Sequence, residues 1–263
     1  MNTFGIEIEC YLNNSKILTG FSIEDDSSLY HPKLKGFEYI SKILDGSLYE
    51  VVFKNIQEHF NSVDVLFHTY KSKAVGATGL HLHFGYDTKV EYNCLDILRS
   101  ICNEQLMSSE FRKYSGRLPN NYCKSTWSLY EALYTILNEI RFSEGLLSLN
   151  KLASNKNHGV NVKNLINLAP DNDTIEYRWG NSSISKDEKT LSSYYKVCHE
   201  HFKRSFTGDR MLTLGGYTLS VVDTLGDTEV KVYKGSEYLG LFNIELDRSK
   251  AKSLCPVAIS NLL

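Results

Sequence analysis

The amino-acid sequence predicts an α+β protein, because segments with the two-residue period of a strand alternate with segments that have the period of a helix. Hydrophobic residues make up 42% of the 263 residues and charged residues 23%, as in ordinary globular proteins. From residue 212 onward the helical period disappears, and short strands with glycine-rich turns replace it. We therefore expect a larger domain over residues 1–211 and a small β-rich appendage over residues 212–263.

The first predicted strand, residues 5–10, places two glutamates on one face. Glu7 and Glu9 alternate with apolar residues, and residues i and i+2 of a strand point to the same side. Taken alone, such a pair is typical of an edge strand with one solvated face. A functional interpretation therefore depends on what the other strands carry.

Four further strand-like segments also place polar side chains opposite an apolar face. Their polar residues are Glu38, His81, His83, Asn161, Glu176 and Arg178. If the five strands are neighbours, four carboxylates, two imidazoles and an arginine share one surface, and that much negative charge is costly without cations. Carboxylate and imidazole groups are ligands for Mg²⁺ or Mn²⁺, so this surface is a candidate metal site.

Helical periods separate these strands. The predicted helices cover residues 47–61, 88–107, 126–141 and 185–206. Capping-box matches at residues 88–91 and 185–188 open the second and fourth of them. Residues 110–124 are expected to be irregular and basic.

Composition narrows the class of protein. The formal net charge is −2, which gives no indication of a nucleic-acid partner. The six cysteines form no CxxC pair, so we expect reduced, buried thiols and no zinc ribbon. No signal peptide and no membrane-spanning run is visible, which predicts a cytoplasmic protein without a membrane partner. The phosphate-loop motifs and the GxSxG nucleophile motif are also absent from the sequence.

Several short motifs occur in a defined order over residues 4–206. They are Gly5–Glu9, Asp26–Leu29, Gly36–Ser41, Thr78–His83, Arg117–Cys123, Val160–Val162 and Thr174–Arg178. Each is weak alone, but the ordered set resembles the amidoligase family. These are relatives of glutamine synthetase and glutamate–cysteine ligase found in phages, bacteria and fungi. The segment Trp179–Ser182 departs from the family, which usually has a more apolar residue and a Gly-Thr there.

The resemblance implies a glutamine-synthetase-like fold, in which a curved antiparallel sheet backed by helices holds ATP and Mg²⁺ or Mn²⁺. It implies an ATP-dependent carboxylate–amine ligase that forms an amide or peptide-like bond through an acyl phosphate. The metal ligands would be Glu7, Glu9, Glu38, His83 and Glu176. His81, His83, Asn161 and Arg178 would contact the nucleotide, and Arg117 and Arg178 would be catalytic.

The amine substrate must also lose a proton, and a nearby carboxylate can accept it. Asp26 is the candidate, because the resemblance places this acidic turn near the site. The substrates would be a small-molecule or peptide carboxylate and an amine, in the host cytoplasm if the chain is phage-encoded. Their identity and the oligomeric state are left open by the sequence.

Other functions fit the same residues. A metal-dependent hydrolase also uses carboxylates and histidines to activate water. A non-catalytic member of the fold would bind a nucleotide or peptide, or serve as a structural phage protein. In a fourth alternative, the β-rich appendage directs a ligase to a protein, a cell-wall peptide or modified nucleic acid.

Overall fold

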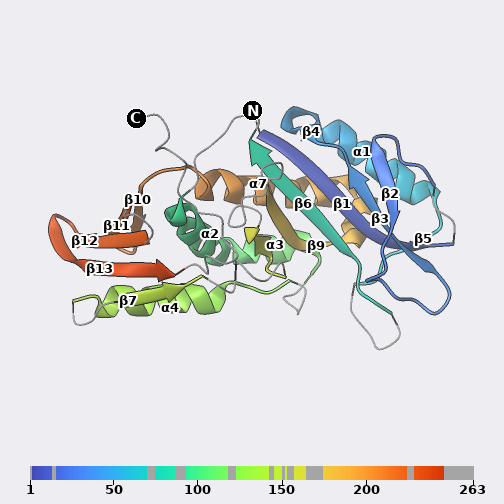
Figure 1. Cartoon of the computed structure of the whole chain (residues 1–263). Helices are drawn as coiled ribbons and strands as arrows, with labels where there is room; N and C mark the ends of the chain where they lie inside the picture. Colours follow the sequence, from blue (N-terminus) through green and yellow to red (C-terminus); the bar gives the residue numbers. More distant parts are fainter. Residues whose placement is uncertain are drawn as a thin grey trace, which may run out of the picture. The chain divides into compact units, whose positions relative to one another are not determined.

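The structure is a computed structural model that describes residues 2–13, 16–69, 75–86, 93–117, 123–141, 145–149, 152, 157–163, 174–223 and 228–245. It confirms the α+β class: sheets of mostly antiparallel strands are backed by helices, and further strands follow toward the C-terminus (Figure 1). Two compact units interleave along the chain. The first comprises Met1–Thr88, Met107–Lys124 and Glu176–Glu200, and the second Lys89–Leu106, Ser125–Ile175 and His201–Leu263.

The first unit is built on a sheet whose long strands follow the order β2-β3-β1-β6-β9. These strands are β1 (Asn2–Leu12), β2 (Phe21–Asp25), β3 (Lys35–Ser41), β6 (Gly79–Tyr86) and β9 (Ile175–Asn181). Two short strands, β4 (Leu44–Asp45) and β5 (Val65–Leu66), also pair with β1. The strands β3, β4, β5 and β6 all run antiparallel to β1.

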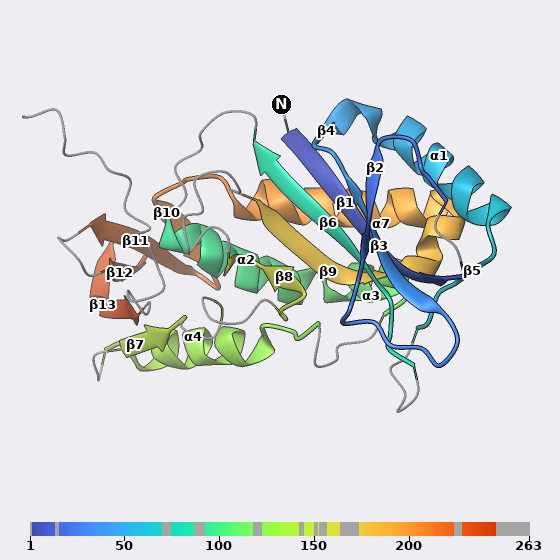
Figure 2. The ribbon, with the colours of Figure 1, turned by 45° about the vertical axis from the view of Figure 1, so that its right-hand side comes forward.

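The apolar side of this sheet packs against helices. Helix α1 (Tyr49–Ser62) follows the short helix η1 (Gly46–Leu48), and α7 (Glu188–Ser205) follows η2 (Ser182–Lys186). Phe4 of β1 contacts Phe53 of α1 and Tyr195 of α7, with ring centroids 6.1 Å and 5.1 Å away. These helices lie behind the strands in Figures 1 and 2. The other side of the sheet therefore carries the polar residues that alternate with this core.

The second unit contains a sheet in the order β10-β11-β12-β13-β7. Its strands are β7 (Gly145–Ser148), β10 (Met211–Leu214), β11 (Tyr217–Asp223), β12 (Thr228–Lys234) and β13 (Glu237–Glu245). Helices α2 (Cys94–Leu106) and α4 (Trp127–Glu139) and the short strand β8 (Val160–Asn161) also fall in its ranges. The strands predicted beyond residue 212 are thus present, and β7 joins them in parallel with β13.

A buried ion pair explains why α2 belongs with these C-terminal strands. Asp96 pairs with Arg99 at 2.5 Å and accepts hydrogen bonds from the backbone N–H groups of Thr207 and Gly208. Arg99 in turn donates to the carbonyl oxygen of Met211, where β10 begins. The segment 201–211 is therefore fastened to α2, and the two compact units do not divide at the expected 211/212 boundary.

Two local expectations need correction. Residues 108–115, placed mostly in an irregular segment by the sequence, form helix α3 (Ser108–Ser115), which ends at Gly116 in the left-handed conformation (φ 66°). The capping box predicted at 185–188 is wrong, because Asp187 accepts hydrogen bonds from Lys189 N and Thr190 N and caps α7 itself. The capping box at 88–91 lies outside the described residues.

The expected buried thiols Cys10, Cys94, Cys102 and Cys198 are buried, as is Cys123. In the described part of the chain, no helix combines the length and the apolar character that a membrane span requires.

His201 predicts a pH dependence of stability. Burial lowers its pKa to about 4, against a smaller opposing effect from its 3.0 Å contact with the carbonyl oxygen of Ser100. Between pH 6.5 and 4 the unfolded chain therefore binds more protons than the folded one. The free energy of unfolding falls with falling pH by up to about 1.4 kcal/mol per unit from this group.

The variant His201→Gln keeps a donor for Ser100 and removes the titration. We expect the stability advantage of wild type over the variant to shrink as pH falls from 7 to 4.5, measured by urea unfolding. A constant difference across that range would contradict this prediction.

Candidate functional site

Strand register assembles the polar groups that the sequence singled out in the first unit. Glu7 of β1 lies directly opposite His81 of β6, and Gly5 opposite His83. On the other side of β1, Glu9 lies opposite Glu38 of β3. Directly opposed residues of antiparallel strands share a face. The alternation read from single strands therefore becomes one continuous polar surface, as predicted.

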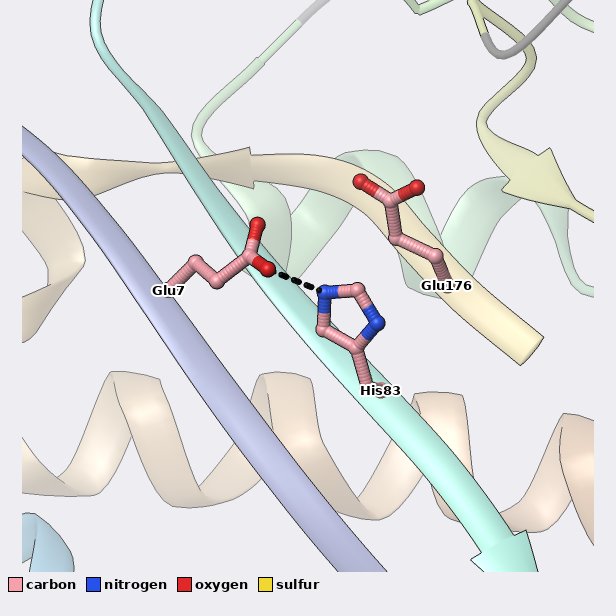
Figure 3. Close-up of side chains that lie close together, drawn as sticks. All are labelled: Glu7, His83 and Glu176. Atoms are coloured by element: carbon pink, nitrogen blue, oxygen red, sulfur yellow. Dashed lines mark ion pairs between the residues drawn. The ribbon is translucent and has the colours of Figure 1, made fainter. Parts of the chain in front are cut away.

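Both histidines contact Glu7. His81 Nδ1 lies 3.1 Å from Glu7 Oε2 and 3.4 Å from Glu176 Oε1, and His83 Nε2 lies 3.0 Å from Glu7 Oε1. Figure 3 shows Glu7, His83 and Glu176 reaching toward one another from β1, β6 and β9. The carboxylate of Glu7 is therefore shared between two imidazoles.

His81 lies between carboxylates. Its Nδ1 faces Glu7 and Glu176. Its Nε2 is buried, has no hydrogen-bond partner among the described residues and lies 3.8 Å from Glu9 Oε1. An imidazole nitrogen and a carboxylate oxygen at that distance are suited to a cation between them, since donors bound to one cation at about 2.1 Å lie roughly 3–4 Å apart.

The charges of Glu7 and His83 stabilise each other. Burial raises the pKa of Glu7, but its contacts with His81 and His83 outweigh burial and hold that pKa well below its usual value. Burial lowers the pKa of His83, while Glu7 and Glu176 more than offset this and raise it above 6.5. Glu7 is thus ionised throughout the physiological range.

Glu38 has the opposite character. Burial, followed by the negative charges of Glu7, Glu9 and Asp26, raises its pKa to about 8, although Arg178 lowers it. Directly opposed carboxylates also flank it on both neighbouring strands, at Glu9 and Glu24. Without a cation, Glu38 is therefore mainly protonated at neutral pH, and this end of the surface is short of positive charge.

Among the residues that the structure describes, two sets of side chains have the composition and spacing of a metal site. In one, Glu7, His83 and Glu176 bring their ligand atoms within 4.8 Å of one another, and in the other Glu7, Glu38 and His81 do so. Glu7 belongs to both sets. Oxygen-rich sets with a single imidazole suit Mg²⁺ or Mn²⁺ better than a thiolate site would. The predicted ligand Glu9 is in neither set, and His81, expected to contact nucleotide, is in the second.

Two arginines border the same surface. Arg178 of β9 forms an ion pair with Glu176, and its side chain is largely buried. Arg117, which follows α3, is buried and donates from Nη1 to the backbone oxygen of Arg178 at 3.2 Å. The Nε atoms of both have no hydrogen-bond partner in the described part of the chain. The structure thus brings both predicted catalytic arginines to the site.

Gly79 lies where β6 enters the site, and the sequence did not identify it as a site residue. A Cβ on it would stand 2.8 Å from His81 Nε2, 3.1 Å from Arg117 Nη1 and 3.2 Å from Glu9 Oε2. Its N–H donates to Glu9 Oε2 at 2.5 Å. The lack of a side chain at this position is what allows these three groups to approach one another.

Asp26 and Asn161 belong to neither of the two metal sets. Asp26 follows β2 directly, and its Oδ1 accepts a hydrogen bond from the N–H of Ser28, as in an Asx turn. The negative charge of Asp26 nevertheless helps to raise the pKa of Glu38. Asn161 is buried in the second unit, where its Oδ1 accepts from the N–H of Lys163. The roles assigned to both residues remain predictions.

The raised pKa of Glu38 predicts pH-dependent metal binding. Glu38 must lose its proton to bind a cation, so the affinity for Mn²⁺ should rise with pH up to about 8, by up to about tenfold per unit for this group. In Glu38→Gln the affinity should be lower and its rise with pH shallower, as measured by calorimetry at pH 6, 7 and 8. Glu58→Gln, which changes an exposed glutamate of α1, is the matched control and should keep the wild-type slope. An unchanged slope in Glu38→Gln would contradict the assignment.

A scan of known protein families finds none that matches this chain, and a search of curated proteins finds no match either.

Proposed function

We propose that this chain is an ATP-dependent carboxylate–amine ligase that holds two divalent cations on the polar face of its first sheet. One observation carries the proposal: two acid–histidine sets share Glu7 on a surface that Arg117 and Arg178 border. Paired cations and arginines are the groups that phosphoryl transfer requires. The antiparallel sheet backed by α1 and α7 is compatible with a glutamine-synthetase-like fold, which we propose as its class.

Each residue of the polar surface has a proposed role in the reaction. Glu7, Glu38 and Glu176 with His81 and His83 would hold Mg²⁺ or Mn²⁺, which when bound neutralises phosphate charge and aligns the nucleotide. Arg178 would face the γ-phosphate and stabilise the charge that develops on it, and Arg117 would support Arg178 or contact the phosphate directly. The substrate carboxylate would attack the γ-phosphorus, forming an acyl phosphate and releasing ADP. The amine would then attack the carbonyl carbon of the acyl phosphate, forming the amide and releasing inorganic phosphate. Asp26 is the proposed acceptor of the proton that the amine releases.

A direct test uses hydroxylamine in place of the unidentified amine. Incubation with a pool of carboxylates, Mn²⁺ and ATP should produce a hydroxamate together with ADP and phosphate, detected by mass spectrometry. Omitting ATP or adding a chelator should abolish the product. Failure to bind a non-hydrolysable ATP analogue in the presence of Mn²⁺ would contradict the proposal.

Glu38 supports a second candidate, a metal-dependent hydrolase. A carboxyl group with a pKa of about 8 is a proton acceptor of the right strength to activate water at neutral pH. The same assay separates the two activities, since hydrolysis of an ester or amide needs Mn²⁺ but no nucleotide.

A further inference from the structure

Two buried polar residues at the end of β9 bind the carbonyl groups of Thr78 and Gly79, on the two sides of the N–H that donates to Glu9. Asn181 Nδ2 donates to the carbonyl oxygen of Thr78 at 3.0 Å, and Ser182 Oγ donates to the carbonyl oxygen of Gly79 at 2.5 Å. Both side chains are completely buried. The metal-site residues themselves do not explain why these two polar groups are present.

The Thr78 carbonyl and the Gly79 N–H belong to one peptide group. Asn181 donates to the oxygen of this peptide, and the Gly79 N–H of the same peptide donates to Glu9 Oε2 at 2.5 Å. Because a trans peptide directs its C=O and N–H to opposite sides, the amide of Asn181, this peptide and the carboxylate of Glu9 form a continuous hydrogen-bond chain. Such chains polarise and strengthen their members in a buried environment.

Asn181 is itself held in place. Its Oδ1 accepts a hydrogen bond from the N–H of Ser183, which caps η2, so the orientation of its amide is determined. The remaining oxygen of Glu9 is then the one that lies 3.8 Å from His81 Nε2. The position of that oxygen follows from η2, which contributes no ligand to the site.

We infer that Asn181 and Ser182 are positioning residues that hold the carboxylate of Glu9 toward His81 by fixing the backbone on the two sides of the Gly79 N–H, at the carbonyl groups of Thr78 and Gly79. The inference rests on the proposed function, because it makes Glu9 a held ligand of the proposed metal site. Residues that orient metal ligands commonly change metal affinity by about 10–100-fold when they are replaced. They lie in the segment 179–182, where the sequence departs from the amidoligase motif.

Two variants each remove one of the two hydrogen-bond donors. Ser182→Ala removes the donor to Gly79, and Asn181→Ser removes the donor to Thr78 while keeping a residue able to cap η2. Ser182→Thr restores the hydroxyl. Ser185→Ala is the matched control, since Ser185 is a completely buried serine of the same short helix whose hydroxyl donates to the Ser182 carbonyl.

The first readout needs no metal. By NMR of the metal-free protein, the Gly79 amide proton should exchange at least about tenfold faster in Ser182→Ala and Asn181→Ser, beyond the change in exchange that the slowest-exchanging core amides of each variant show. Its chemical shift should also move. Ser182→Thr and Ser185→Ala should match wild type. Wild-type exchange and shift at Gly79 in both donor-removing variants would overturn the inference.

The second readout is Mn²⁺ binding by calorimetry. The dissociation constant should rise by about tenfold or more in Ser182→Ala and Asn181→Ser, but stay at the wild-type value in Ser185→Ala. Unchanged affinity in both would overturn the inference while leaving the proposed function standing. If wild type binds no Mn²⁺ although Gly79 exchange responds as expected, the proposed function fails and the positioning of Glu9 stands.

Discussion

Glu7→Gln is expected to weaken Mn²⁺ binding by at least about 100-fold, because Glu7 belongs to both candidate metal sets. Glutamine keeps the size of the side chain and an oxygen that can accept from His81 Nδ1. It removes the negative charge, which is fully present at neutral pH because the pKa of Glu7 is held well below its usual value. The expected result is therefore a loss of charge at both sets with little change in shape.

Calorimetric titration with Mn²⁺ alone measures this effect, with thermal unfolding recorded in parallel. Glu58→Gln, on the exposed face of α1, is the matched control and should bind Mn²⁺ as wild type does. If Glu7→Gln keeps the wild-type dissociation constant, Glu7 is not a shared ligand and the metal assignment is wrong.

Arg178→Gln is expected to reduce ATP turnover by about 1,000-fold or more, the scale of arginines that stabilise phosphoryl-transfer transition states. Mn²⁺ affinity should be maintained or should increase, because the substitution removes a positive charge beside Glu176. This combination is the reverse of the result for Glu7→Gln, in which the metal itself is lost. Equal losses of metal binding in both variants would contradict the separate roles.

Removing Arg178 from the buried Glu176 can cost about 3–5 kcal/mol of stability, so folding must be checked. Arg178→Lys retains the charge beside Glu176 and loses the planar, forked donor set. It should fold as wild type does and still lose turnover. Arg141→Gln is the control for loss of an arginine, because Arg141 forms an exposed ion pair with Glu237.

The sequence predicts the polar surface well because a strand's two-residue period is a local property. Glu7 and Glu9 were assigned to one face from six residues of sequence, and the pairing of β1 with β6 and β3 places His81 and Glu38 on that face. The residues of a single strand do not, however, determine the register in which that strand pairs with its neighbours. Only the pairing of the strands shows that Glu7 is shared by two metal sets. The same holds for the position of Glu38 between Glu9 and Glu24.

The interactions that sequence reasoning missed join residues far apart in the chain. The hydrogen bonds of Asn181 and Ser182 with the Thr78–Gly79 segment span about a hundred positions, and no periodicity encodes them. Helix α3 was missed for another reason: its basic residues obscured a short apolar stripe, although Gly116 is a recognisable helix-ending signal. The sequence predicts the fold class because the α+β class follows from the order of helices and strands along the chain alone.

The interleaving of the two units has a consequence for synthesis on the ribosome. Strand β1 leaves the ribosome well before β9, which supplies Glu176 and Arg178 and follows helices α2 and α4 of the second unit. Until then Glu7, Glu9 and Glu38 lack Arg178. We therefore expect the sheet of the first unit to be completed late during synthesis. Divalent cations in the cell should aid that step by neutralising the carboxylates of Glu7, Glu9 and Glu38.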